Sequence, residues 1–147
     1  MKYQILLLTS LSFLVIPAVN ITSISPPASA MPITIPATAK ALATGSFVAA
    51  EHPTKGLVQI VETNGKKFLK FDRSFKSDNG PDLFVILHDQ NPPAAYDESN
   101  YLSLGRLKKT DGEQLYEIPV GTDTTRFNSV VIWCKQFNAT FGFASLN

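Results

Sequence analysis

From residue 45 onward the sequence is a series of short apolar runs separated by turn residues. No stretch repeats apolar residues with the 3.6-residue period of a helix. The clearest unit is a hairpin formed by residues 57–63 and 66–72. These two runs flank Asn64-Gly65, the dipeptide that best tolerates the positive φ angles of a type I′ turn. The pattern predicts an all-β domain.

Further strands are predicted at similar spacing along the chain. They are residues 82–88, 101–104, 104–107, 114–118, 129–135 and 140–146, with Asp111-Gly112 as the tight turn of a meander and 137–139 as the turn of a final hairpin. About eight strands, with no helix to cover a sheet face, must bury one sheet against another. We therefore predict an antiparallel β-sandwich, with a small β-barrel as the second candidate.

The first thirty residues differ in composition from the rest, because they contain one charge, Lys2, and no acid. Residues 5–19 form an apolar run that falls short of the ~20 residues needed to span a bilayer. Ala28-Ser29-Ala30 then fits the pattern that a signal peptidase cleaves. We expect a signal peptide at 1–30, a flexible linker at 31–44 and one domain at 45–147. The product would be periplasmic, cell-envelope or extracellular, with no integral membrane anchor after cleavage.

Composition excludes several classes of function. Removing residues 1–30 lowers the Lys+Arg count from 13 to 12, against 12 Asp+Glu, so the mature chain has no formal net charge. Nucleic acid is therefore not expected as a partner, because phosphate binding needs a clustered basic excess. A single cysteine excludes an internal disulfide framework and a multi-thiolate zinc site, and no metal site is predicted. Acyl, phosphoryl and hydride transfer have no motif support, which leaves enzymatic activity open.

Cys134 is the residue whose chemistry stands out. On the predicted strand 129–135 its side chain shares a face with Val130 and Ile132, while Trp133 points to the opposite face. A free cysteine is often a small buried hydrophobic residue, but an unpaired thiol in an oxidising compartment is a hazard unless it is shielded or used. Its position near a strand end predicts a sulfur close to the rim of the sandwich. Burial without function, a redox or ligand role, and an intermolecular disulfide all remain open.

The two histidines are weak ligand candidates. His52 lies in a predicted loop and His88 ends a predicted strand, and either imidazole could join Cys134 in a mixed nitrogen and sulfur site. No close spacing supports such a site. Any haem would be bound non-covalently, because the C-x-x-C-H attachment motif needs two cysteines. Asp82 follows a Gly-Pro turn that it is expected to cap, and the basic residues 106–109 are expected to be solvated.

Motifs spread from residue 45 to residue 146 resemble those of the DM-thirteen domain family, a predicted electron-transfer domain associated with DOMON and cytochrome-like modules. They are Gly45-Ser46-Phe47, the Gly56 turn, Asn79-Gly80-Pro81-Asp82-Leu83, Leu104-Gly105, Gly112 with Tyr116 and Ile118-Pro119, Val130-Val131-Ile132-Trp133-Cys134, and Phe137 leading to Phe141-Gly142. The last two segments are the most specific. The resemblance implies a β-sandwich-like fold with a characteristic cysteine that acts as a free thiol or as a ligand to a prosthetic group such as haem. Cys134 falls on that position.

Three hypotheses follow. The first is an exported redox module centred on Cys134, with a histidine or the Asp82 region nearby. No partner domain is present in this chain, so the electron donor or acceptor would be a separate redox protein. The second is a non-enzymatic binding module that recognises a partner through the polar loops 89–100 and 119–128, with Cys134 as a buried structural residue. The third is a disulfide-linked dimer through Cys134.

Overall fold

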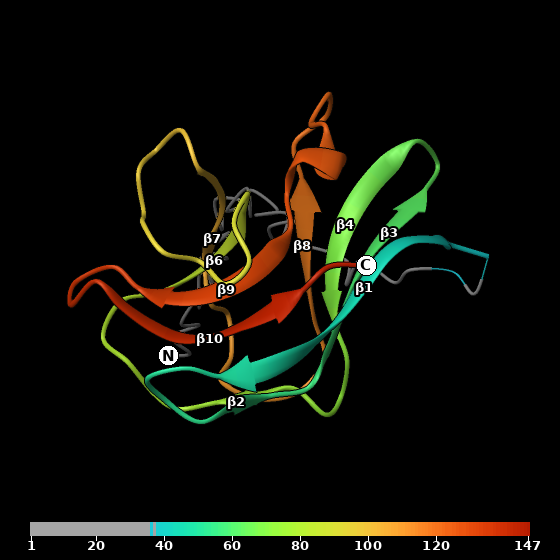
Figure 1. Ribbon diagram of the computed structural model, residues 1–147. Coiled ribbons are helices and arrows are strands. Elements are labelled where there is room, and N and C mark those ends of the chain that lie inside the picture. Colours follow the sequence, from blue (N-terminus) through green and yellow to red (C-terminus); the bar gives the residue numbers. More distant parts are fainter. Residues whose placement is uncertain (1–35, 37) are drawn as a thin grey trace, which may run out of the picture. The chain divides into compact units, whose positions relative to one another are not determined.

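The computed structural model describes residue 36 and residues 38–147, so the predicted signal peptide lies outside the described residues. The described part is built from strands and one short 3₁₀ helix (Figure 1). Its elements are β1 (Lys40–Ala49), β2 (Thr54–Lys55), β3 (Leu57–Thr63), β4 (Lys66–Phe71), β5 (Lys76–Ser77), β6 (Leu83–His88), β7 (Tyr101–Arg106), β8 (Gln114–Ile118), η1 (Thr124–Arg126), β9 (Ser129–Cys134) and β10 (Ala139–Ser145). The prediction of an antiparallel all-β fold is confirmed.

The predicted hairpin at Asn64-Gly65 is confirmed. Strands β3 and β4 pair from Thr63 opposite Lys66 outward, and φ is 51° at Asn64 and 72° at Gly65. Both values lie in the left-handed region that a type I′ turn requires at its two central positions. The twist of this turn matches that of the strands, which fixes the register of this half of the sheet.

Eight strands form one sheet in the order β7-β6-β9-β10-β1-β3-β4-β8, and β2 pairs with β5 in a small second sheet. The long strand β1 joins the two halves of the large sheet. Its first residues, from Lys40 to Ser46, pair with β3, and those from Phe47 to Ala49 pair with β10. The halves face each other as in the predicted sandwich. Because they are continuous through β1 and meet again where β7 approaches β8, the sheet is nearly closed into the barrel that was the second candidate.

The start of β1 corrects one predicted boundary. The strand begins at Lys40, so the last five residues of the predicted linker 31–44 belong to the sheet. Lys40 and Ala41 lie opposite Glu62 and Val61 of β3, and Thr44 exchanges backbone hydrogen bonds with Asn147. The apolar residues of this segment, Ala41, Leu42 and Ala43, are consecutive, so they do not show the alternation that marks a half-buried strand. Their strand conformation follows from the hydrogen bonds that the neighbouring backbones offer, which sequence periodicity does not report.

The predicted meander around Asp111-Gly112 is wrong in its pairing. Strand β7 pairs with β6, and β8 pairs with β4, so the chain crosses from one half of the sheet to the other at this turn. Side chains close the seam between β7 and β8. The Tyr116 hydroxyl donates to Gln114 Oε1 at 2.7 Å and accepts from the Lys108 N–H at 2.9 Å. The residues 107–110 are thereby tied to β8.

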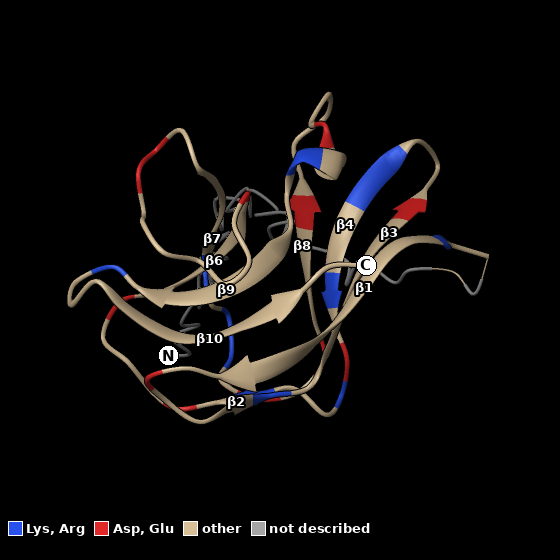
Figure 2. Cartoon of the chain, viewed as in Figure 1, with Lys and Arg blue, Asp and Glu red and all other residues tan. Residues whose placement is uncertain are grey.

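Apolar residues form two clusters, one on each face of β9. The inner cluster fills the space enclosed by the curled sheet and contains Val130, Ile132 and Cys134. The outer cluster contains Ile86, Val131 and Trp133. Figure 2 shows that β9 and β10 have no charged residues along their length. All six residues of β9 are buried, because the sheet interior covers one face and loop 89–100 contributes Tyr96 to the other.

Candidate functional site

Cys134 is the last residue of β9 and lies opposite Leu83 of β6 and Ala139 of β10. The predicted parity of β9 is confirmed, because Cys134 belongs to the inner cluster and Trp133 to the outer one. The expected access at the rim is absent, since the exposed fraction of Cys134 is 0%. The thiol is free and enclosed by the core. Its position at a strand end therefore does not give solvent access.

The turn before β6 closes over this end of the core. A Cβ atom added at Gly80 would lie 2.8 Å from Leu83 Cδ2 and 2.9 Å from Phe141 Cζ, so the Gly80 backbone rests directly on those two side chains. Leu83 and Phe141 both belong to the inner cluster that contains Cys134. The backbone N–H of Lys135 donates to the carbonyl of Asp82 at 3.0 Å, which holds this turn against the end of β9.

A basic cleft lies on the outer side of Leu83. Its volume is about 340 Å³, and it is lined by Asn79, Gly80, Pro81, Leu83, Arg106, Leu107, Lys108, Lys109 and Thr110. Leu83 lines this cleft and is also the cross-strand partner of Cys134. Paired residues on adjacent strands have Cβ atoms about 4.5–5.5 Å apart. Leu83 is thus the residue that the cleft lining and the surroundings of the thiol share.

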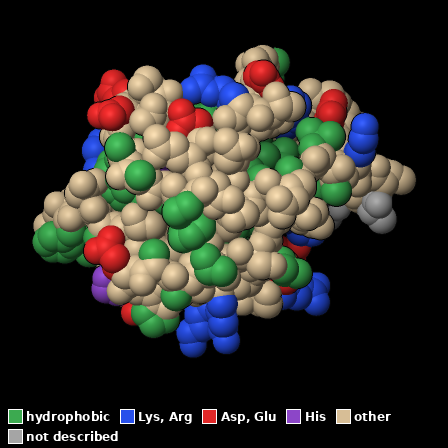
Figure 3. Space-filling view, viewed as in Figure 1, with side chains coloured by type: hydrophobic (Ala, Val, Ile, Leu, Met, Phe, Trp, Pro, Cys, Tyr) green, Lys and Arg blue, Asp and Glu red, His purple; other side chains and the backbone are tan. Residues whose placement is uncertain are grey.

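The lining of this cleft includes three basic residues, Arg106, Lys108 and Lys109. Arg106 Nη2 lies 2.5 Å from Asp82 Oδ1 and forms an ion pair with it. The Lys108 ammonium donates to the Leu115 carbonyl, and Lys109 is exposed. Figure 3 shows further Lys and Arg side chains gathered at the edge of the molecule near β2. The residues expected to be merely solvated therefore form the wall of a cleft, and Asp82 lies beside it.

The two histidines lie in different places. His52 stacks on Phe141 with ring centroids 3.9 Å apart, and its Nδ1 is 3.6 Å from Asp78 Oδ2, so it lies at the Cys134 end of the barrel but outside the core. His88 is the other end residue of β6. With a rise of about 3.3 Å per residue, the five steps from Leu83 place it roughly 16 Å away along the strand. His88 also faces the outer cluster, so the structure does not bring it together with Cys134.

The outer face of β9 contains an aromatic group that the sequence did not reveal. Trp133 stacks on Tyr96 with centroids 4.7 Å apart and an interplanar angle of 15°, and Tyr101 lies 5.7 Å from Trp133. The Trp133 Nε1–H donates to Asn138 Oδ1 at 3.2 Å. Tyr96 arrives from a loop, so no strand alternation could have signalled this contact. Trp133 is thus separated from the Cys134 sulfur by the sheet itself.

Haem and metal ligation can be tested against this geometry. Because Cys134 has no exposed surface, no water-sized space adjoins it, inside or outside the molecule. An iron atom could not reach the sulfur without displacing core side chains, so these residues as arranged do not fit a haem. Within residues 38–147 no group of three or more His, Cys, Asp or Glu side chains is placed to hold a metal ion.

The loops of the alternative binding hypothesis differ in how they are held. Loop 89–100 packs on the sheet through Tyr96, and its Ser99 carbonyl accepts a hydrogen bond from Arg126 at 2.8 Å. In loop 119–128, Val120 is exposed, whereas Phe127 is part of the inner core. Recognition of a partner by these loops stays a prediction. Among the described residues, no helix has the length and apolar character needed to cross a membrane.

Fold and site together define a small antiparallel β domain, nearly closed into a barrel, whose one thiol is enclosed behind a basic cleft. A family model described as Electron transfer DM13 matches residues 46–146, which is more than half of the chain. The chain belongs to the DM13 family, as its motifs indicated. No curated protein and no solved structure matches it.

Proposed function

We propose that this domain acts in electron transfer and that Cys134 is its redox residue, working as a thiol. Membership of a family described as electron transfer supports the redox role. The observation that carries the assignment to Cys134 is that its cross-strand partner, Leu83, also lines the basic cleft. A ligand role is less well supported, because the enclosed sulfur leaves no space for a prosthetic group.

In this proposal the thiol reacts in a locally opened state. Outward movement of Leu83 and the turn at Gly80 would bring the sulfur to the cleft wall formed by Arg106, Lys108 and Lys109. Nearby cations favour the thiolate, which is the reactive form of cysteine. Local opening of a few side chains needs less free energy than global unfolding. The enclosed state would then protect the thiol between reactions.

A lone cysteine determines the type of partner. Oxidation to a disulfide requires a second sulfur, and the chain has no other cysteine. The second sulfur must therefore come from a separate molecule: the Cys134 thiolate would attack a disulfide of that molecule, which forms a mixed disulfide and releases the other sulfur as a thiolate. We propose a separate redox protein as the partner. Its approach would be favoured by acidic groups around its own disulfide, because the cleft is basic.

The experiment is to incubate the folded protein, purified from its native compartment, with oxidised glutathione and to measure its intact mass and absorption spectrum. The expected result is a colourless protein that gains one glutathione without denaturant, and no adduct in Cys134→Ala. Alanine is the better control, because serine would bury a hydroxyl group in the core at a cost of about 1–3 kcal/mol. A thiol that stays unmodified until the protein unfolds would contradict the proposal. A Soret band that disappears in Cys134→Ala would replace the thiol role by the ligand role.

The same mass measurement tests the proposed export. Cleavage after Ala30 would give a mature chain of residues 31–147, in a periplasmic, cell-envelope or extracellular location. A protein that retains residues 1–30 would contradict this proposal. The disulfide dimer remains a weaker proposal, because the enclosed Cys134 would have to leave the core in both copies.

A further inference from the structure

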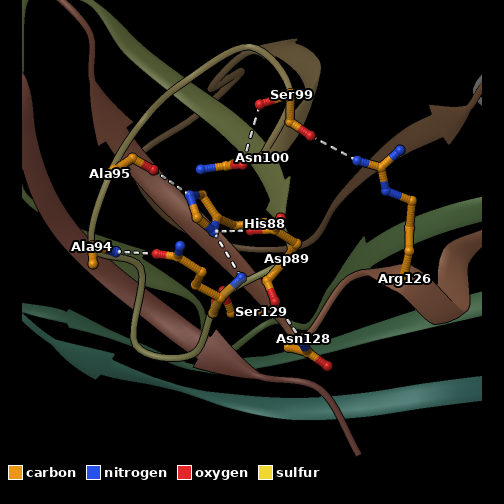
Figure 4. Close-up of polar contacts among 10 residues, drawn as sticks. His88, Asp89, Ala94, Ala95, Ser99, Asn100, Arg126, Asn128 and Ser129 are labelled. Atoms are coloured by element: carbon orange, nitrogen blue, oxygen red, sulfur yellow. Dashed lines mark hydrogen bonds and ion pairs between the residues drawn. The ribbon is translucent and has the colours of Figure 1, made fainter.

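His88 is fully buried, and both nitrogens of its ring have partners in the loop that follows it (Figure 4). Nε2 lies 2.6 Å from the Ala95 carbonyl, and Nδ1 lies 3.0 Å from the Gln90 backbone nitrogen. A carbonyl can only accept, so Nε2 carries the proton. A backbone N–H can only donate, so Nδ1 uses its lone pair. The structure thus holds the neutral imidazole in one tautomer.

The Asp89 carboxylate lies beside the same nitrogen and is a possible second partner for it. Asp89 Oδ1 lies 3.4 Å from His88 Nδ1, and this oxygen is buried without a hydrogen-bond partner. Protonation of His88 places a hydrogen on Nδ1. That hydrogen would oppose the Gln90 N–H, whereas the Asp89 carboxylate could accept it. The two protonation states of His88 therefore favour different partners for Nδ1.

The other groups around the His88 ring are uncharged, apart from Asp89. The edge of the ring faces Tyr96, with centroids 5.5 Å apart, and its strand neighbours are Tyr101 of β7 and the uncharged Ser129 of β9. The cation of this hydrogen-bond network, Arg126 of η1, donates to the Ser99 carbonyl at the far end of the loop. Within the described residues, Asp89 is thus the charged group paired with this imidazole.

Loop 89–100 depends on the contact that protonation would break. The Gln90 carbonyl accepts from Ser129 Oγ at 2.7 Å, and its side-chain Oε1 accepts from the Ala94 N–H at 3.1 Å. Gln90 therefore organises the turn that leads to Ala95 and Tyr96. Tyr96 in turn covers Trp133 on the outer face of β9. A shift at Gln90 would be transmitted to this aromatic contact.

We propose that His88 holds loop 89–100 in a proton-dependent way and acts as a latch. On protonation, Nδ1 would stop accepting from the Gln90 N–H and would donate to the Asp89 carboxylate instead. This exchange would loosen the packing of Tyr96 on Trp133. Histidine is the side chain whose charge ordinarily changes between about pH 5 and 8. The latch lies at the opposite end of β9 from Cys134. It goes beyond the proposed redox function, and each can fail without the other.

The chain offers its own reporter and its own control, because it contains one tryptophan and two histidines. Trp133 fluorescence of the full-length protein is recorded from pH 8 to pH 5 for wild type, His88→Gln and the control His52→Gln. The expected result is one reversible transition in wild type and in His52→Gln, and none in His88→Gln. A flat wild-type profile, or an unchanged transition in His88→Gln, would overturn the latch.

A second variant keeps the test decisive if His88→Gln does not fold. Asp89→Asn leaves the hydrogen bonds of the neutral imidazole intact and removes the anionic acceptor. It should move the midpoint of the Trp133 transition to lower pH, because the protonated ring would lose its anionic acceptor. The Gln90 amide resonance in wild type should shift with the same midpoint as the fluorescence. A Gln90 amide that does not respond to acid, or an unchanged midpoint in Asp89→Asn, would show that Nδ1 does not exchange partners.

Discussion

Leu83→Ala is expected to accelerate alkylation of the native Cys134 thiol by about 30-fold or more. Leu83 is the cross-strand neighbour of Cys134 and also part of the cleft wall. Truncating a core leucine costs about 2–5 kcal/mol. If 2 kcal/mol of this falls on the local opening rather than on global unfolding, the open population rises about 30-fold. The rate is measured with a small neutral alkylating reagent under native conditions.

Leu87→Ala is the matched control for this experiment. Leu87 lies on the same strand and in the same inner cluster, but it pairs with Val130, far from the cleft. It should lower the free energy of unfolding by a similar amount and leave the native alkylation rate close to that of wild type. Equal acceleration in both variants would mean that the thiol is reached through general destabilisation. The assignment of Leu83 as the gate would then be wrong.

Alkaline pH is expected to destabilise the domain between about pH 10 and 12 through Tyr116. Burial raises the pKa of Tyr116 to about 12, against an ordinary value of 10.0, although the hydrogen bond from Lys108 acts in the opposite direction. The folded state therefore favours the neutral phenol. The contribution of the buried phenol to the free energy of unfolding is fully present below pH 10 and is lost as pH rises through 12. Two pKa units correspond to about 2–3 kcal/mol in the free energy of unfolding.

Urea unfolding at pH 9 and at pH 11.5 measures this effect, with Tyr116→Phe as the comparison. The variant should be less stable at pH 9, because it loses the hydroxyl that joins Gln114 to Lys108. It should also lose most of the alkaline dependence. Some dependence should remain from Tyr96, whose pKa burial also raises. If wild type and Tyr116→Phe lost stability equally between the two pH values, the buried phenol at the seam would not be the cause.

Local signals in the sequence predicted much of this fold. Asn64-Gly65 and the alternating runs beside it have a specific backbone geometry and period, and the structure confirms them. The pairing of β8 with β4 could not be predicted in the same way, because the turn at Asp111-Gly112 is compatible with a hairpin or with a crossover. The strand at Lys40 was missed because its apolar residues are consecutive and do not alternate with polar ones, and its hydrogen bonds come from partners distant in sequence.

The candidate site shows the same division between local and distant contacts. Strand parity placed Cys134 and Trp133 on opposite faces of β9, because alternation is a property of the strand alone. Burial of Cys134 depends on Leu83 and on the Gly80 turn, about fifty residues earlier in the chain. Loop contacts such as that of Tyr96 with Trp133 follow no period. The position of Cys134 in the sequence therefore predicted the face of β9 to which the thiol points, but not whether solvent can reach it.

The central claim is that Cys134 is enclosed in the ground state and reached by a local opening at Leu83. The most direct test is the alkylation rate of wild-type Cys134 as a function of urea concentration. Local opening exposes little surface, so the rate should depend only weakly on urea until global unfolding takes over. A slope equal to that of global unfolding at every urea concentration would contradict the claim. So would a rate in native buffer equal to that of a free thiol.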